Sequence, residues 1–245
     1  MLLGTLMETT VSGSHPNPAM PRFLSIETSG DACSVSLIDA DHVQSLDTGE
    51  PRSHARLLVL LIKELMQDLP GPLDGICVDE GPGSYTGLRI GVSTAKGLAW
   101  SLGCPLLTIS SLELLAAAVP RDHEGMVHVR AMLPSRGEAV FSARYTAEGE
   151  SWQKTDDVRY AVPSEFLDAD PSGTIMVVPD GVEIHPEWTN LPDHRIALHS
   201  SLAAPLLRNQ SERYRVQELS AFEPLYVRSF VARKPKVSIF DRLPF

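Results

Sequence analysis

The links between the first three strand-like segments constrain the fold of this 245-residue chain more than any other feature. Residues 22–29, 33–39 and 41–48 read as strands, and three residues or fewer separate each from the next. Parallel neighbours need a crossover of about a dozen residues, so these strands must pair antiparallel. Gly30 and Asp31 supply the turn chemistry of the first hairpin.

After residue 48 the pattern changes to alternating helix-like and strand-like segments, which is typical of βα units with parallel strands. We predict helices at about 54–69, 84–102 and 111–119, and strands at 74–80 and 105–110. This order predicts an α/β fold whose mixed sheet has an antiparallel flank and a parallel centre. The N-terminal lobe covers residues 21–119.

The segment from Pro120 to Gly125 breaks this pattern, and a second, reduced lobe is expected over residues 120–220. Its predicted elements are strands at 127–133, 138–145 and 174–179, and helices at 164–169 and near 202–214. Residues 221–245 form a C-terminal segment and tail. Residues 1–20 are rich in Ser, Thr, Pro and Gly and are expected to be a disordered leader.

Composition limits the classes of function. Lys and Arg total 21 against 31 Asp and Glu, a net charge of −10, so phosphate backbones would repel the isolated chain. The three cysteines, Cys33, Cys77 and Cys104, are widely spaced and predict neither a disulfide framework nor a metal site. No apolar run reaches the ~18 residues of a membrane span, and residues 1–21 contain no Lys or Arg. We expect a cytoplasmic protein.

The strongest local signal is EGPGSYTGLRIGVSTAKGLAWSLG at residues 80–103, where a strand runs through a glycine-rich turn into a helix. Backbone N–H groups at such a helix start can bind an anion, which makes Gly83, Ser84 and Thr86 candidate phosphate-binding residues. The spacing fits neither of the two familiar nucleotide-binding loops. Leu88 and Arg89 follow Gly87 where a Walker loop has Lys and Ser or Thr, and Gly83 and Gly87 are one residue too far apart for a Rossmann fingerprint.

Helix packing is the alternative interpretation of the same residues. Gly87, Gly91, Ala95 and Ala99 recur every four positions, which gives the helix one smooth side that another helix backbone could approach closely. Leu57 and Leu60 project from the polar side of the preceding helix. Leu57, Leu60, Gly87, Gly91 and Ala95 are therefore the predicted partner interface, unless other parts of this chain cover both helices.

Catalytic motifs are few. The sequence contains no HExxH, CxxC or GxSxG, and His123, His128, His194 and His199 are interpreted as structural. No catalytic residue and no metal ligand is predicted.

The first hairpin, IETSGDACSVSL, occupies the position where kinases and ATPases of the actin, sugar kinase and Hsp70 superfamily (ASKHA) hold nucleotide phosphates. Glu27 stands in place of their metal-binding Asp, Ser29 replaces a glycine, and Asp31 adds negative charge. A carboxylate there repels a phosphate unless a cation intervenes.

Several segments together resemble the bacterial TsaB (YeaZ) family. They are FLSIETSGDACSVSL, His54 at the start of the first helix, GPGSYTGLRIGVSTAKGLAWSLG, SRGEAVFSARY at 135–145 and EPLYVRS at 223–229. The resemblance is good over residues 22–119 and then continues as short islands to about residue 230. It implies a two-lobed, actin-like and ribonuclease-H-like (ASKHA) fold with mixed sheets.

The resemblance also implies a non-catalytic scaffold role in making N6-threonylcarbamoyladenosine (t6A) at position 37 of tRNAs that read ANN codons. The implied partners are the catalytic relative TsaD, the ATPase TsaE, tRNA through the complex only, and a second copy when TsaD is absent. No cofactor is expected on the isolated chain, although a nucleotide could bind at a shared interface of the complex. In TsaD two histidines of the first helix bind the metal, whereas here only His54 is present.

One departure from the family pattern concerns the second lobe. The family often has Asp-Ala-Arg before its Gly-Glu, and this chain has Leu133, Pro134 and Ser135 before Arg136. Two other functions stay open at this stage. One is a small-molecule kinase or ATPase that uses the groove between the lobes, and the other is a metal-dependent peptidase, for which the sequence offers no ligand set.

Overall fold

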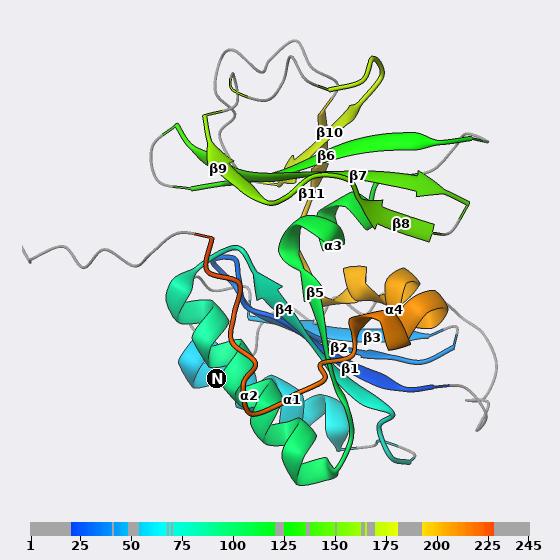
Figure 1. Cartoon of the computed structure of the whole chain (residues 1–245). Coiled ribbons are helices and arrows are strands. Elements are labelled where there is room, and N and C mark those ends of the chain that lie inside the picture. Colours follow the sequence, from blue (N-terminus) through cyan, green and yellow to red (C-terminus); the bar gives the residue numbers. More distant parts are fainter. Residues whose placement is uncertain are drawn as a thin grey trace, which may run out of the picture.

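The computed structural model contains two mixed β-sheets with short helices between them (Figure 1). The structure describes residues 21–40, 42–48, 54–67, 69, 71–120, 125–135, 138–149, 151–162, 165, 170–180 and 193–227. The predicted leader, the tail beyond residue 227 and, apart from Glu165, the helix predicted at 164–169 lie outside the described residues. No helix within these ranges is long and apolar enough to cross a bilayer.

The first sheet has the predicted mixture of pairings. Its strands are β1 (Phe23–Glu27), β2 (Ser34–Ile38), β3 (Val43–Asp47), β4 (Gly75–Gly81) and β5 (Leu106–Ser110). They lie in the order β3-β2-β1-β4-β5, with β3, β2 and β1 antiparallel and β1, β4 and β5 parallel. The short links do force hairpins, and each crossover to a parallel strand contains a helix.

Helices α1 (His54–Met66) and α2 (Tyr85–Leu102) pack together on one face of this sheet (Figure 1). Both end within three residues of the predicted bounds. Their inner sides share one apolar core with β1, β2 and β4, and Leu58 and Ala95 are among its buried members. Ala95, which the sequence analysis placed in a partner interface, therefore belongs to this core.

The second sheet has the order β11-β10-β6-β7-β8, and β9 also pairs with β7. Its strands are β6 (Val127–Pro134), β7 (Val140–Glu148), β8 (Ser151–Lys154), β9 (Arg159–Ala161), β10 (Ile175–Pro179) and β11 (Asp193–Ile196). β6, β7 and β10 match predicted strands. The sequence analysis missed β8, β9 and β11, since runs of only three or four residues carry too little alternation to read as strands.

Short helices fill the space between the two sheets (Figure 1). They are α3 (Ser111–Ala117), η4 (Ser200–Ala203), α4 (Ala204–Gln210) and η5 (Ser211–Tyr214), and the last three occupy the segment predicted as one helix near 202–214. One continuous apolar core runs from the first sheet through these helices into the second sheet. The α/β class with two lobes and mixed sheets is confirmed, and the lobes are joined by shared packing.

Candidate functional site

The turn between β4 and α2 is closed by the chain's own backbone. Ser84 N donates a hydrogen bond to Ser29 O at 2.8 Å, and Ser84 Oγ caps the helix by accepting from Gly87 N at 3.3 Å. A Cβ atom at Gly83 would lie 2.5 Å from the Cβ atom of Ser29, which is far inside van der Waals contact. The glycine at this position thus serves close packing, and phosphate binding by Gly83, Ser84 and Thr86 stays a prediction.

The smooth side of α2 faces the end of strand β1. A Cβ atom at Gly87 would overlap Thr28 O, one at Gly91 would overlap Thr28 Oγ1, and Ala95 is completely buried in the core beneath α1 and α2. The prediction that Gly87, Gly91 and Ala95 face a partner chain is therefore wrong. The close backbone approach that these small residues permit is made within this chain.

The outward sides of α1 and α2 carry large apolar side chains instead. The exposed fraction is 61% for Val59, 57% for Leu60 and 81% for Trp100, and Leu102 is also exposed. Leu60 is thus exposed as predicted, whereas Leu57 is half-buried. The two helices that carry these side chains cover the same face of the first sheet (Figure 1).

Trp100 and Val59 were not among the predicted interface residues, although the sequence contained a signal for Trp100. Ser93 is a polar residue of α2, and Trp100 lies seven residues, or two helical turns, further along the same side of the helix. A tryptophan on such a side is the more informative observation, because single exposed leucines and valines are common on protein surfaces.

Two carboxylates lie buried at the carboxyl ends of β1 and β4. Glu27 and Asp79 are each 2% exposed. Glu27 Oε1 accepts hydrogen bonds from the Ser29 backbone N–H at 2.6 Å and from the Ser29 hydroxyl at 2.7 Å. Asp79 Oδ1 accepts from Gly81 N and from the Ser111 hydroxyl, each at 2.7 Å, whereas Asp79 Oδ2 is buried without a partner among the described residues.

Burial and the charge of Asp79 keep a proton on Glu27 at neutral pH, and burial also favours the protonated form of Asp79. Desolvation, followed by the charge of Asp79, raises the pKa of Glu27 to about 8, and desolvation raises the pKa of Asp79 to about 6. Asp31, which the sequence places in the same hairpin, is exposed to solvent. Across the described residues no three His, Cys, Asp or Glu side chains converge as metal ligands.

The histidines occupy separate places. His128 lies in β6 and His194 in β11, so they are strand residues rather than loop residues, and His199 Nδ1 accepts from Ser201 N at the start of η4. His123 lies outside the described residues, as does the side chain of His54.

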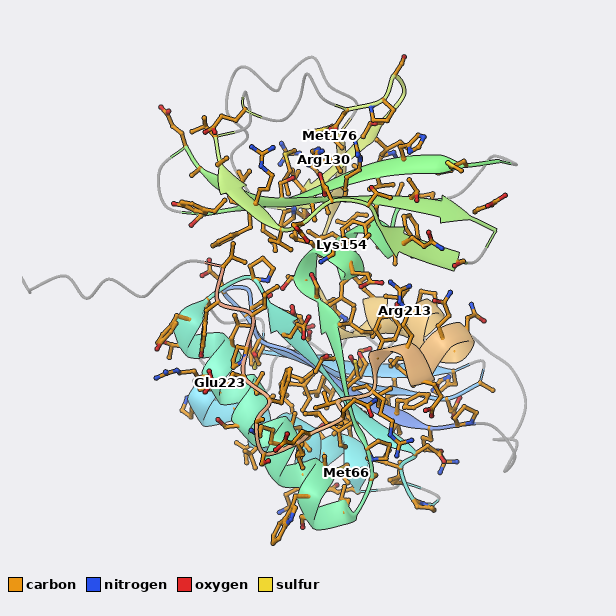
Figure 2. The ribbon with its side chains drawn as sticks, viewed as in Figure 1. Met66, Arg130, Lys154, Met176, Arg213 and Glu223 are labelled. Carbon is orange, nitrogen blue, oxygen red and sulfur yellow. The ribbon has the colours of Figure 1, made fainter. Side chains whose placement is uncertain are left out.

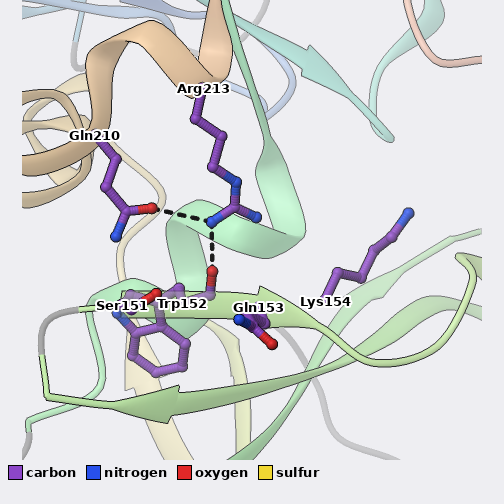
Figure 3. Close-up of a pocket in the computed structure, with 6 residues that line it drawn as sticks. All are labelled: Ser151, Trp152, Gln153, Lys154, Gln210 and Arg213. Carbon is purple, nitrogen blue, oxygen red and sulfur yellow. Dashed lines mark hydrogen bonds between the residues drawn. The ribbon is translucent and has the colours of Figure 1, made fainter.

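A groove lies between β8 and η5, on the seam of the two lobes (Figure 3). Its lining consists of Ser151, Trp152, Gln153, Lys154, Gln210 and Arg213. The Arg213 guanidinium crosses this seam: it donates to Trp152 O and to Gln210 Oε1, and it lies 3.4 Å from Glu113 Oε1. Tyr214 Oη donates to the same Glu113 oxygen at 2.9 Å. These contacts fasten η5 to β8 and α3.

The departure from the family pattern in the second lobe falls at the end of β6. Leu133 and Pro134 pair with Phe141 and Val140 of β7, and Ser135 N donates to Ala139 O in the connecting hairpin. The residues that replace the family's Asp-Ala-Arg are therefore part of the strand and its turn.

Comparison with known proteins identifies the family of this chain. The family model of TsaD, the tRNA N6-adenosine threonylcarbamoyltransferase, matches residues 50–185, more than half of the chain. A TsaB protein of Haemophilus influenzae is 27% identical over 86% of this chain and 95% of its own length. The chain belongs to the TsaD-related TsaB (YeaZ) family.

Further relatives agree with this family. TsaB of Bacillus subtilis is 42% identical over 42% of this chain, and the match spans about half of that protein, 47%. A crystal structure from Pseudomonas aeruginosa, described as similar to peptidase YEAZ, superposes with a TM-score of 0.70 at 25% identity. It covers 85% of this chain and 100% of the Pseudomonas chain. Both TsaB proteins are named as tRNA threonylcarbamoyladenosine biosynthesis proteins.

Two glycines of α2 provide a matched test of the packing at Thr28. Gly91→Ala should lower the free energy of unfolding by about 1–3 kcal/mol, because the added methyl group overlaps the Thr28 side chain. Gly97→Ala should raise it by about 0.5–1 kcal/mol, because no atom lies within 4 Å and alanine favours the helix. Urea denaturation measures both, and equal effects of the two substitutions would contradict the packing.

The buried carboxylates predict a pH-dependent stability. The folded protein keeps Glu27 protonated up to about pH 8, whereas the unfolded chain releases this proton near the ordinary value of 4.5. Asp79 acts in the same direction between 3.8 and about 6. The folded state thus binds more protons, and the free energy of unfolding should fall by roughly 2–4 kcal/mol between pH 5 and pH 8.

Glu27→Gln should remove most of this fall, while Glu218→Gln at an exposed position should leave it unchanged. Urea denaturation at a series of pH values measures the profile. A Glu27→Gln profile parallel to that of the wild type would show that the pair does not hold the proton.

Proposed function

We propose that this chain is the non-catalytic partner subunit of a TsaD-type threonylcarbamoyltransferase and acts in t6A biosynthesis on tRNA. The proposal combines membership of the TsaB family with one structural observation, the exposed apolar side of α1 and α2. The partner would be the helical face of TsaD that corresponds to these helices. The cytoplasmic location expected from the sequence fits this role.

The exposed side chains have the character of an interface. Trp100 is the kind of residue that dominates binding energy in protein complexes, because it buries a large rigid surface at little cost in conformational entropy. Val59 and Leu60 add aliphatic surface on α1, beside the charged Arg56 and Lys63. An apolar centre with charged residues around it is the usual anatomy of a specific interface.

The site chemistry supports a role without catalysis. Glu27 stands where a metal-binding Asp is expected, yet it is buried and receives its hydrogen bonds from Ser29 and Gly30. Packing of α3 and α4 and the Arg213 contacts bridge the seam between the lobes, which opposes an opening and closing of the lobes around a substrate. These features favour a rigid scaffold.

A kinase or ATPase is the less favoured alternative. It would need room for phosphates between the β1–β2 hairpin and the turn before α2, and there Ser29 and Thr28 already contact Gly83 and Gly87. A TsaE-like ATPase, a nucleotide at a shared interface and homodimerisation in the absence of TsaD remain part of the proposal. A second copy would use the same side of α1 and α2.

Single substitutions on the exposed side test the proposal. Leu60→Glu and Trp100→Glu should each weaken binding to TsaD by at least about a hundredfold, because a carboxylate buried without a counter-charge costs several kcal/mol. Isothermal titration calorimetry with purified TsaD, beside circular dichroism of each variant, gives affinity and folding together. Both variants should keep the wild-type spectrum.

Two controls accompany these variants. Gln153→Glu, at an exposed position of β8 in the second sheet, should bind TsaD as the wild type does. Leu58→Glu should unfold the chain, since Leu58 is 1% exposed on the inner side of α1. Normal binding by folded Leu60→Glu and Trp100→Glu variants would place the interface elsewhere.

A further inference from the structure

Two tyrosines position the side chain of Arg89 on α2. Arg89 Nε donates a hydrogen bond to Tyr226 Oη at 3.1 Å, and the guanidinium lies 4.4 Å from the centre of the Tyr85 ring. The rings of Tyr85 and Tyr226 are 5.0 Å apart. A guanidinium that is stacked on a ring and hydrogen-bonded at Nε has already lost much of its rotamer freedom. It therefore loses less conformational entropy when it binds a further group.

Tyr226 is itself fixed in place by hydrogen bonds of the neighbouring residues. Leu225 N donates to Glu80 O at 2.8 Å, and Lys96 Nζ donates to Phe222 O at 2.9 Å. These bonds tie the segment that carries Tyr226 to β4 and to α2. They also use the ammonium group of Lys96 within the chain.

The guanidinium of Arg89 keeps donors that the chain does not use. The described residues accept a hydrogen bond from its Nε alone, and no ion pair joins it to a described carboxylate. Glu223, which Figure 2 shows beside α2, attracts the guanidinium without forming such a pair. The N–H groups on the two Nη atoms of an arginine match the two oxygens of a carboxylate. Arg89 is thus suited to bind a carboxylate from outside the chain.

Arg89 lies on the outward side of α2, in line with Trp100. The two residues are eleven positions apart. At about 100° per residue they lie within about 20° of each other around the helix, and they are about 16 Å apart along it. Both side chains are exposed, and the residues Ser93 and Gly97 between them are small and exposed as well. A partner that covers Trp100 can therefore reach Arg89.

The two helices are basic although the chain as a whole is acidic. The sequence has 21 Lys and Arg against 31 Asp and Glu. In contrast, α1 and α2 contain Arg56, Lys63, Arg89 and Lys96 but a single acid, Glu64. A second copy of the chain would present the same excess of cations. A partner whose facing surface is acidic is the better match.

We infer that Arg89 binds the carboxylate of an Asp or Glu side chain of the partner and thereby fixes the position in which TsaD docks on α1 and α2. The inference rests on the proposed function and adds the chemistry of the facing surface. A partner that covers Trp100 also excludes water from this side of the helix, which strengthens a charged pair there. A partner docked in another position would leave the guanidinium desolvated without a counter-charge, which opposes association.

Substitution of Arg89 tests the inference with the two purified proteins, in the absence of nucleotide and tRNA. Arg89→Gln should raise the Kd for TsaD at least about tenfold at about 50 mM salt, because the carboxylate of TsaD then lacks its counter-charge. The Kd of the wild type should also rise more steeply with salt than that of Arg89→Gln. Isothermal titration calorimetry measures both. Arg215→Gln, at an exposed arginine outside α1 and α2, should bind within about threefold of the wild type.

Tyr226→Phe separates the contact with the partner from the hydrogen bond within the chain. Arg89→Gln and Tyr226→Phe both remove the bond from Arg89 Nε to Tyr226 Oη, but only Arg89→Gln removes the charge. Tyr226→Phe should therefore raise the Kd by no more than about threefold. Equal weakening by the two variants would overturn the inference, because loss of the internal bond would then explain the effect.

A double-mutant cycle identifies the carboxylate on the partner. Each Asp and Glu on the surface of TsaD is replaced in turn by its amide. One of these replacements should raise the Kd about as much as Arg89→Gln does, and it should add less than about threefold when it is combined with Arg89→Gln.

The outcomes separate the two proposals. Failure of the wild-type chain to bind TsaD would overturn the proposed function, and this inference with it. If the wild type binds, binding by Arg89→Gln within about threefold of the wild type would overturn the inference alone. Weak binding by Arg89→Gln that couples to no acidic residue of TsaD would also overturn it.

Discussion

The close contact between α2 and the end of β1 is the constraint on which the rest of this structure depends. Gly83, Gly87 and Gly91 present a surface without Cβ atoms to Thr28 and Ser29, and any larger residue there would overlap them. This contact brings α2 close to the sheet and closes the turn between β4 and α2, and Glu27 and Asp79 are buried beside it. One packing solution thus accounts for both the tight fold of the first lobe and the proton-holding carboxylates at its edge.

The side chains that this packing leaves exposed on α1 and α2 are the basis of the proposed function. The small residues of α2 make contacts within the chain, so the surface that we propose for a partner consists of Leu60, Val59 and Trp100. The seam between the lobes is filled by helices and fastened by Arg213, which gives these residues a rigid support. A binding surface on a rigid scaffold loses less conformational entropy when a partner docks. This architecture suits the proposed role of a subunit that presents a surface to its partner.

Much of the fold of the first lobe was predictable from the sequence. The short links predicted the antiparallel flank, and the helical spacing of α1 placed Leu60 on its exposed side. The stripe of Gly87, Gly91 and Ala95 was recognised as a close-approach surface but assigned to the wrong neighbour. The helical spacing of small residues shows that another backbone packs closely against α2. It does not show whether that backbone belongs to the same chain or to a partner. The contacts of residues 216–227 with α2 were equally hidden, because hydrogen bonds join Arg89 to Tyr226 and Lys96 to Phe222 across more than a hundred residues of sequence, and no local pattern encodes these pairings.

The central claim is that the outward side of α1 and α2 meets a TsaD-type partner, and side-chain footprinting with hydroxyl radicals tests it most directly. In the free chain Trp100 and Leu60 should be oxidised readily, as should Met126, which is 61% exposed at the start of the second sheet. In the complex with TsaD, oxidation of Trp100 and Leu60 should fall strongly, while that of Met126 should not change. A complex that forms while Trp100 and Leu60 stay fully reactive would contradict the account.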